Sequence, residues 1–368
     1  MDKGKLCVLV GGQYGSEGKG AIAAHIANDY DVHVRVGSPN AGHTIWWHGE
    51  KHVMQSIPCG WINPSADIVI GRGALLNMKQ FMKELVHILT YYPNFLDRLY
   101  IDAEAGILSE KFHEQEGGVH GEMHRRIGST GEGVGPARVA RINRNPDEFK
   151  QFKDVAEEYG LEMCICNNTP KRLAELQDYG HNILIEGTQG SGLSLLHSHW
   201  PYCTSIDTNA AGIISEVGIA PSRVTNVLMV CRTYPIRVAG NSGPMGKEIT
   251  WDELNKRMQD AGYMDVVTPE KTTVTHKVRR IAEWNDELFE QSCLLNNPTE
   301  FAITFADYVD PLLYGCTDPL TVRSSRRLVE FLQEHMPNLG GNIVYVGTGP
   351  KTVVNIKEAS NGSEVRRF

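Results

Sequence analysis

The sequence predicts an α/β fold: a single large domain over residues 1–368, with a mainly parallel central sheet flanked by helices. Three observations predict it. Short runs rich in β-forming residues recur along the chain, and several are apolar throughout, which is typical of strands buried on both faces. Segments with helical patterning separate many of these runs. Glycine-rich polar loops follow several runs, so we expect ligand loops at the carboxyl ends of the strands.

The predicted elements alternate along the chain. The strands are LCVLV (6–10), VHVRV (32–36), DIVI (67–70), RLYI (98–101), NILIE (182–186), VTNVLMV (224–230), FAITF (301–305) and NIVYV (342–346). The helices cover residues 20–28, 76–90, 147–159, 169–178, 251–261 and 318–335. The last two begin at favourable N-caps, Thr250 and either Thr317 or Asp318. Segment 104–145 has too few apolar residues for a core, so we predict a loop or helical excursion with functional contacts.

Composition narrows the class of protein. The chain is 41% hydrophobic and carries a net charge of −8, which disfavours a nucleic-acid-binding role. Its eight cysteines show no zinc spacing and suggest reduced thiols. The first residues run directly into a strand, and no apolar run approaches the length of a membrane span. We therefore expect a cytoplasmic protein without membrane contact, in the host cytoplasm if a virus encodes it.

The stretch GGQYGSEGKG (11–20) is the first candidate site. It lies between a strand and a helix, where backbone N–H groups and the helix N-terminus favour an anion. The Walker A pattern requires glycine where Gln13 stands and Ser or Thr where Gly20 stands. We predict a phosphate loop of a non-standard kind; the alternative is a ligand-free glycine turn.

SPNAGHTI (38–45) follows the second strand and should reach the same sheet edge. Asn40 can bind an oxyanion, the Gly42 carbonyl is accessible, and His43 can transfer a proton near neutral pH. A single histidine in a turn is more often structural. IGSTGEGVGPARVAR (127–141) offers hydroxyls, N–H groups and two arginines, which suits a nucleotide phosphate; a flexible surface loop is the alternative.

Three further motifs follow later strands. EGTQGSGL (186–193), with YCTSIDTNAAG (202–212) after it, brings polar groups to the sheet edge. KTTVTHKVRR (271–280) combines hydroxyls with cations that can hold a carboxylate, although a solvated edge strand explains it equally. TFAD (304–307) and VGTGPK (346–351) could contact a purine base. Together these loops predict a site that binds several phosphates.

The chain resembles the adenylosuccinate synthetase family, in its shorter form. The resemblance lies in the motifs and their order: GGQYGSEGKG, NAGHT, IGSTGEGVGPA, EGTQG, YCTSIDTNAAG, TYPIRV and GTGP. The likeness spans about residues 6–351. It implies a Mg²⁺-dependent ligase that joins L-aspartate to C6 of a purine nucleotide. In the implied mechanism a base removes the N1 proton, O6 attacks the γ-phosphate of a nucleoside triphosphate, and the aspartate amine then displaces phosphate. The resemblance also implies a homodimer.

The resemblance implies roles residue by residue. Catalytic roles fall to Ser16, Lys19, His43 and Gln189. The nucleotide substrate is expected at Ser16, Asn40, Thr130, Gln189, Thr204 and Arg237, with Arg141 supplied by the partner subunit. The triphosphate is expected at Ser16, Glu17, Gly18, Lys19, Gly20, Gly42, His43, Thr44, Asp307, Gly347, Thr348 and Gly349. Aspartate is expected at Thr273, Val274, Thr275, Lys277 and Arg279, and the metal at Ser16 and Gly42.

Two positions depart from the family pattern. The family loop reads G-D-E-G-K-G, and its aspartate is both the N1 base and a metal ligand; here this position is Ser16. The base-reading motif T-K-x-D of GTP users has Phe305 in place of its lysine, although Asp307 remains, so ATP or dATP becomes a plausible donor.

Serine has no useful basicity at pH 7, and a positioned base contributes about 10²–10⁴-fold to rate. The remaining motifs are intact, so we interpret Ser16 as a change of substrate: a small side chain beside N1 leaves room for the 2-amino group of guanine. The chain then resembles family members that use dGMP to make 2-amino-2′-deoxyadenylosuccinate for diaminopurine DNA. The alternatives are an ordinary IMP-dependent synthetase and a non-catalytic nucleotide-binding paralogue.

Overall fold

A computed structural model describes residues 2–263, 266–272, 277–337 and 342–357. Its main feature is a ten-stranded sheet in the order β17-β16-β15-β11-β1-β10-β2-β5-β7-β9, in which every neighbouring pair is parallel except β16 with β17. The strands are β1 (Leu6–Gly11), β2 (Val32–Arg35), β5 (Asp67–Ile70), β7 (Leu99–Asp102), β9 (Ile165–Cys166), β10 (Ile183–Glu186), β11 (Asn226–Arg232), β15 (Glu300–Thr304), β16 (Ile343–Gly349) and β17 (Thr352–Asn355). The predicted α/β class and all eight predicted strands are confirmed.

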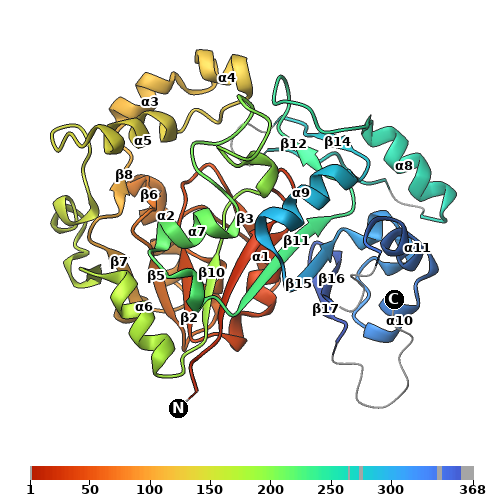
Figure 1. The fold of residues 1–368 in the computed structure, drawn as a ribbon, viewed down its shortest axis with the longest axis horizontal. Helices are drawn as coiled ribbons and strands as arrows, with labels where there is room; N and C mark the ends of the chain where they lie inside the picture. Colours follow the sequence, from red (N-terminus) through yellow and green to blue (C-terminus); the bar gives the residue numbers. More distant parts are fainter. Residues whose placement is uncertain (1, 264–265, 273–276, 338–341, 358–368) are drawn as a thin grey trace.

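Helices cover both faces of the sheet (Figure 1). They are α1 (Lys19–His25), α2 (Met78–Leu89), α3 (Glu110–Glu116), α4 (Glu122–Ile127), α5 (Val134–Asn143), α6 (Thr169–Asp178), α7 (Ala210–Val217), α8 (Trp251–Asp260), α9 (Asp286–Asn296), α10 (Pro319–Ser324) and α11 (Arg326–His335). Within the described ranges, no helix has the length and apolar character needed to cross a bilayer.

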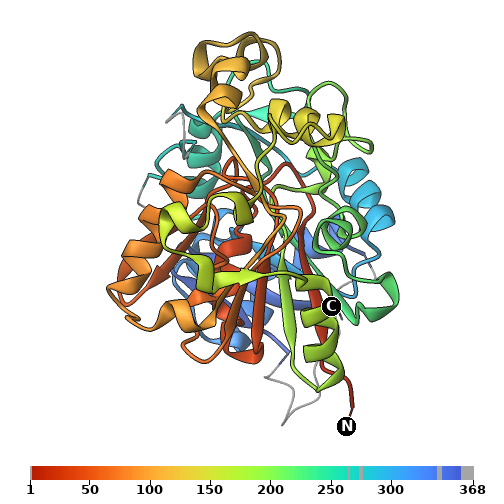
Figure 2. The ribbon, with the colours of Figure 1, turned by 90° about the vertical axis from the view of Figure 1, so that its left-hand side faces the viewer.

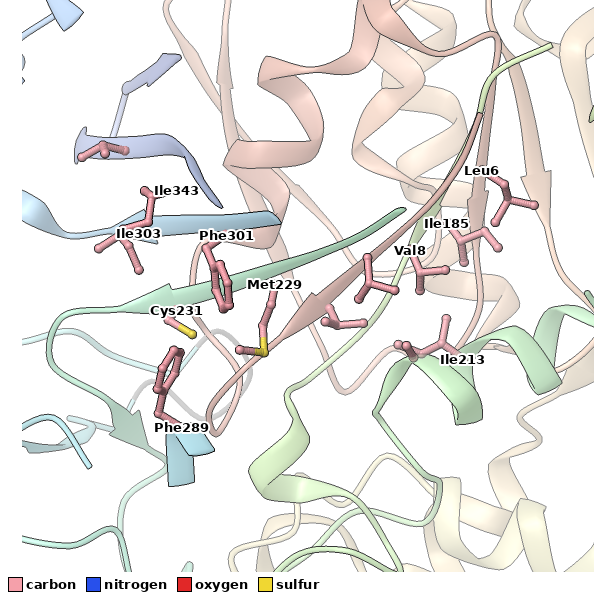
Figure 3. Close-up of a cluster of buried hydrophobic side chains, with 14 of the residues drawn as sticks. Leu6, Val8, Ile185, Ile213, Met229, Cys231, Phe289, Phe301, Ile303 and Ile343 are labelled. Carbon is pink, nitrogen blue, oxygen red and sulfur yellow. The ribbon is translucent and has the colours of Figure 1, made fainter. Parts of the chain in front are cut away.

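Side chains alternate between two hydrophobic cores along the central strand β1. Leu6 and Val8 face α7 and α9, in the cluster that Figure 3 shows around Met229 and Phe301. Cys7 and Leu9 face the opposite cluster, with α1 and α2. Because both faces are covered, the strand is apolar at every position, as the sequence predicted.

Smaller β-elements complete the fold. β3 (His43–Trp47) and β4 (Glu50–Met54) form an antiparallel hairpin. β6 (Leu75–Leu76) pairs with β8 (Gly106–Ile107), and β14 (Arg280–Ala282) pairs with both β12 (Ile236–Arg237) and β13 (Glu248–Ile249).

The helix predicted at 147–159 is wrong. The chain there makes two short 3₁₀ turns, at Phe152–Asp154 and Glu157–Tyr159. The Phe152 N–H donates to the Ala105 carbonyl and the Lys153 N–H to the Ala103 carbonyl, so long-range backbone pairing replaces helical pairing. The helix predicted at 318–335 is divided at Ser325, whose side chain caps α11.

The 104–145 excursion contains α3, α4 and α5, which lie above the sheet at the end opposite the N-terminus (Figures 1 and 2). It also holds a small apolar cluster that includes Phe112, Val134 and Ala137, although we expected too few apolar residues for a core. The loops after β1, β2, β10 and β11 leave the sheet at this same end, since these strands are parallel.

Candidate active site

A cavity of about 210 Å³ opens at the carboxyl ends of the strands. It is lined by many of the predicted site residues: Ser16, Lys19, Asn40, Gly42, His43, Thr130, Gln189, Thr204, Arg237, Lys277 and Arg279. The structure therefore brings together groups from seven separate segments of the chain. Thr273, Val274 and Thr275 lie outside the described residues.

The 11–20 loop folds around an internal ion pair. Gly15, Ser16 and Gly18 all have positive φ, at 84°, 59° and 89°. The Glu17 carboxylate turns inward and accepts from the backbone N–H groups of Gln13, at 3.1 Å, and Gly15, at 2.7 Å. The Lys19 ammonium lies 2.7 Å from Glu17 and also donates to the Gln189 carbonyl. Both charged side chains are buried, so the loop is rigid without a bound anion.

Ser16 is the exposed residue of this loop. Its carbonyl accepts a hydrogen bond of 3.1 Å from the guanidinium of Arg232, at the end of β11. Gln13 ties the loop to the same strand, because its side-chain amide exchanges two hydrogen bonds of 2.9 Å with the backbone of Arg232. Ser16 therefore lines the cavity from a left-handed backbone that a buried arginine supports.

His43 is buried against a carboxylate. Its Nδ1 hydrogen-bonds Glu186, which also pairs with Arg35 at 2.7 Å and accepts from the Cys59 N–H at 2.7 Å. Burial, helped by the charge of Arg35, lowers the pKa of His43 to about 4. Burial alone would raise the pKa of Glu186, but Arg35 and His43 outweigh it and hold that pKa at about 2. The pair is thus a neutral imidazole oriented by an ionised carboxylate.

Sequence reasoning noted Glu186 at a strand end but assigned it no role. The structure shows why it matters: β10 and β2 are neighbours, and Glu186 stands in register with Arg35. Of the described residues, His43, Cys59 and Glu186 form the one group of three that could approach a metal ion. The Arg35 ion pair and the protonated Cys59 thiol, whose pKa is raised by burial, argue against a metal within it.

Two cavity side chains carry buried oxygens without a partner among the described residues. They are Asn40 Oδ1 and Thr130 Oγ1, both predicted to bind the substrate phosphate. A buried polar atom without a hydrogen bond costs about 1–3 kcal/mol, so each is a position where a ligand would be favourable.

The loop that carries Thr130 is held by α3. Glu116, buried at the end of this helix, accepts from the Ser129 hydroxyl and from the Gly133 N–H at the start of α5. Glu116 was not predicted as a site residue. The sequence gives no clear signal for it, since its neighbours on α3 are ordinary exposed carboxylates.

The other side of the cavity is aromatic and cationic. Arg237 stacks on the Tyr14 ring at 4.5 Å, and burial lowers its pKa to about 10. Gln189 donates to the Thr204 hydroxyl at 3.0 Å. Burial also lowers the pKa of Arg279. A negatively charged ligand beside Arg237 and Arg279 would offset their positive charges.

Residues predicted for the base of the triphosphate do not line this cavity. Asp307 follows β15, whereas β16 ends with Gly347, Thr348 and Gly349. The Thr348 hydroxyl donates to the Cys316 carbonyl at 2.8 Å. Asp307 keeps one buried oxygen without a described partner, and burial raises its pKa to about 6. This carboxyl group is thus available to a ligand.

The remaining predicted residues surround the cavity without lining it. Glu17 and Gly18 support the loop, Gly20 is the second residue of α1, and Thr44 lies in β3. Arg141 lies on a separate surface hollow with Phe149, and its guanidinium donates to the Arg72 carbonyl at 3.3 Å. It does not reach the cavity of its own chain.

Comparison with known proteins gives one consistent result. The adenylosuccinate synthetase family model matches residues 8–158 and 145–313. Adenylosuccinate synthetases of Methanococcus maripaludis S2 and Pyrococcus horikoshii are each 35% identical over 347 residues, which is 94% of this chain and 96% of each relative. That of Archaeoglobus fulgidus is 35% identical over 358 residues, covering 95% of this chain and 98% of the relative.

Two solved structures share the fold. Cyanophage S-2L succinoaminodeoxyadenylate synthetase, bound to dGMP and to dATP as an energy donor, superposes with a TM-score of 0.78 at 27% identity, covering 96% of both chains. Fully ligated adenylosuccinate synthetase from Plasmodium falciparum gives 0.78 at 19% identity, over 96% of this chain and all of the other. The chain therefore belongs to the adenylosuccinate synthetase family of C–N ligases, which condense aspartate with a purine nucleotide.

Proposed function

We propose that this chain condenses L-aspartate with dGMP, using ATP or dATP, to give 2-amino-2′-deoxyadenylosuccinate. The observation that carries the proposal is Ser16, which lines the cavity where the family motif has an aspartate. A hydroxyl is smaller and uncharged, so it accommodates the exocyclic 2-amino group that guanine has and hypoxanthine lacks. The resemblance to a phage enzyme bound to dGMP and dATP supports the same substrate.

The reaction proceeds in two balanced steps. O6 of dGMP attacks the γ-phosphorus as the N1 proton passes to solvent, and the nucleoside diphosphate departs with the bridging oxygen. The aspartate amine then attacks C6, the phosphate leaves with O6, and the amine loses a proton. Lys19 holds the transferred phosphoryl group, and His43 protonates a phosphoryl oxygen. Its pKa of about 4 in the free chain must rise for this task, which the negative charge of a bound phosphoryl group accomplishes.

Different residues of the cavity bind different substrates. Asn40 and Thr130 hold the nucleotide phosphate by donating from the Asn40 side-chain amide nitrogen and from the Thr130 hydroxyl, which lacks a partner among the described residues. Gln189 and Arg237 contact the nucleoside, and Lys277 and Arg279 bind the carboxylates of aspartate with Thr273, Val274 and Thr275. Asp307 and the segment from Gly347 to Gly349 hold the base of the triphosphate, and Phe305 in place of a lysine favours adenine there.

The site suits Mg²⁺ held mainly by phosphates. The Ser16 hydroxyl and the Gly42 carbonyl are neutral oxygen donors on the same cavity, while the Glu17 carboxylate is occupied by backbone N–H groups and Lys19. Mg²⁺ commonly takes few protein ligands and binds through substrate phosphates. When bound, the ion neutralises the charge of the phosphoryl groups. Both protein donors would hold it from the loops that carry Lys19 and His43.

The homodimer is proposed from the position of Arg141. This arginine lies outside its own cavity, on α5, between Val139 and Ile142, which are exposed by 57% and 72%. Exposed apolar side chains beside an arginine whose aliphatic part is packed against the protein are typical of a protein–protein interface. A partner subunit packed there would receive Arg141 at its substrate phosphate.

An IMP-dependent adenylosuccinate synthetase is the second candidate. It is favoured by the relatives of that name at 33–35% identity over nearly the whole chain. Under this alternative, Ser16 would be a tolerated change in the loop rather than a determinant of the base.

One assay separates the candidates. The purified chain is given Mg²⁺, aspartate and ATP or dATP, with dGMP, GMP or IMP, and both phosphate release and the succinyl-nucleotide are measured. We expect product with dGMP and at least tenfold lower kcat/KM with IMP, since one unpaired or crowded polar group costs about 1–3 kcal/mol. Turnover of IMP without dGMP would establish the second candidate. Binding without turnover of any nucleotide would indicate a non-catalytic paralogue.

A further inference from the structure

A further ion pair lies behind the cavity, between a buried arginine and a glutamate whose side chain is 26% exposed. Arg232, the last residue of β11, is fully buried, and its guanidinium forms a two-point pair with the carboxylate of Glu270. The same guanidinium lies over the Phe305 ring at 3.7 Å. Neither Arg232 nor Glu270 is among the described residues that line the cavity, so neither belongs to the contacts assigned above.

The pair touches three ligand loops at once. Arg232 donates to the Ser16 carbonyl at 3.1 Å, which fixes the 11–20 loop. Glu270 begins the turn that leads to Arg279, and its carbonyl accepts from the Arg279 N–H at 2.8 Å. The Tyr308 hydroxyl, beside Asp307, donates to Glu270 at 3.5 Å. One arginine and one glutamate therefore connect the loops assigned to the purine, to aspartate and to the triphosphate base.

Stability alone does not explain this arrangement. Buried ion pairs are often no better for folding than apolar residues of the same size, because desolvation offsets the attraction. The Arg232 Nε also lacks a partner among the described residues. What the pair does supply is geometry, since a planar guanidinium can hold a carboxylate and a carbonyl in fixed directions at the same time.

We propose that Arg232 and Glu270 are positioning residues that hold Ser16 against the purine and couple the nucleotide loop to the aspartate turn. This inference rests on the proposed function for the roles of Ser16 and Arg279. When the pair is intact, it holds Glu270, and through the Glu270 carbonyl also Arg279, in a fixed position relative to Ser16. Loss of the pair lets the two loops move independently, so aspartate binding and the chemical step both suffer.

Glu270→Gln tests the coupling, because it keeps the shape of the side chain and removes its charge. We expect KM for aspartate to rise about tenfold and kcat to fall by a similar factor, within the usual range of coupling between sites. Arg232→Lys keeps the charge but replaces the two-nitrogen fork by one ammonium. We expect it to lower kcat while changing KM for aspartate less.

The chain provides a matched control. Arg172 pairs with Asp67 at 2.7 Å, lies 3.7 Å over the Tyr100 ring and also has an Nε without a described partner. Asp67 begins β5, at the sheet edge opposite the cavity. Asp67→Asn should lower the melting temperature to a similar extent as Glu270→Gln, while kcat and both KM values stay within about twofold. Equal kinetic effects in the two variants, or no effect in Glu270→Gln, would overturn the proposal.

The coupling between the two loops can be tested even if the proposed substrate, dGMP, is wrong. If the wild type uses IMP and not dGMP, the same comparison is made with IMP, and the coupling is tested although the dGMP assignment has failed. If it turns over neither, or a variant is too unstable for kinetics, amide hydrogen exchange of residues 12–18 replaces the kinetic readout. Faster exchange there in Glu270→Gln or Arg232→Lys than in Asp67→Asn supports the pair, and equal exchange overturns it.

Discussion

Ser16 combines an unusual side chain with an unusual backbone. A non-glycine residue in the left-handed region costs about 1–2 kcal/mol, and here the hydrogen bond from Arg232 to the Ser16 carbonyl offsets part of that cost. The loop is therefore less stable than an unstrained turn would be, but its conformation directs the Ser16 side chain into the cavity. Such local strain is typical of positions where geometry matters to function.

The first prediction concerns the side chain at this position. Aspartate tolerates the left-handed conformation better than most residues, so Ser16→Asp should preserve the loop. The added carboxylate would crowd the 2-amino group of guanine, and we expect kcat/KM for dGMP to fall at least tenfold, as for other crowded or unpaired polar contacts. Steady-state kinetics with dGMP and IMP measure the effect.

Ser16→Ala serves as its control, because it keeps the space and removes the hydroxyl. Because the Ser16 hydroxyl is also a proposed Mg²⁺ donor, this comparison is made on dGMP binding without Mg²⁺ and not on turnover. We expect the Kd of Ser16→Ala for dGMP to stay within about threefold of the wild type, since the change adds no group that crowds C2 of the purine. Undiminished dGMP turnover by Ser16→Asp would remove the steric argument for guanine.

Individual site residues could be predicted because they lie in short contiguous motifs. Asn40, His43, Gln189 and Arg279 all line one cavity, as their motifs suggested. Glu186 could not be assigned in the same way: it lies 143 residues from His43, and only the strand order makes them neighbours. A local pattern shows which groups a loop offers, but not which groups from other loops they meet.

At the scale of elements, the loop after α4 depends on the end of α3, where Glu116 also lines the cavity. Glu116 ends α3 and holds both Ser129 and the first turn of α5, so the position of Thr130 depends on it. The sequence predicted an excursion here but not this clamp. The reason is that its excess of glycine and charge masks three short helices, two of which, α3 and α5, share a small apolar cluster.

Glu116→Ala should therefore impair the nucleotide site, at whose wall Glu116 lies. Its loss leaves the Ser129 hydroxyl and the Gly133 N–H without their acceptor, and we expect KM for the nucleotide to rise about tenfold, the effect of roughly 1.4 kcal/mol. Glu114→Ala, on the exposed side of the same helix, is the matched control and should leave KM unchanged. Equal KM values for the two variants would contradict the clamp.

The elements that could not be predicted share a cause. The segment 147–159 has helical composition, yet its backbone pairs with residues 103–105, and a neighbour in space overrides local propensity. The helices α7 and α9 were not predicted either, although each buries a single face. Of the three buried residues of α9, Ser292 and Asn296 are polar, so its apolar pattern is weak. The eight strands were predictable because burial on both faces leaves a strong, short apolar signal.

At the scale of the whole molecule, the parallel sheet gathers loops from distant parts of the chain at one edge. Arg141 is the exception, since it faces away from the cavity of its own chain. If a partner subunit supplies it, each site requires two chains, and the symmetry of a dimer makes this testable.

Mixing two inactive variants tests the shared site. Arg141→Ala and His43→Ala are each expected to be nearly inactive as homodimers. In an equal mixture, half of the dimers are mixed, and one of the two sites in each is intact, so about a quarter of wild-type activity should return. Activity is measured after exchange of subunits, with each variant alone as the control. No recovery, despite mixed dimers detected by native mass spectrometry, would place Arg141 outside the site.

The ion pair of Lys19 with Glu17 has one more consequence. In the free chain this lysine is already neutralised, and the amides of Gln13 and Gly15 are already bonded to the same carboxylate. A lone phosphate ion, abundant in any cell, must displace those contacts and brings few of its own. A nucleoside triphosphate also brings a base and several charged oxygens, whose contacts with the protein compensate for the contacts that it displaces. We therefore expect the loop to favour a triphosphate over a lone phosphate ion, so that inorganic phosphate inhibits the synthetase assay only weakly.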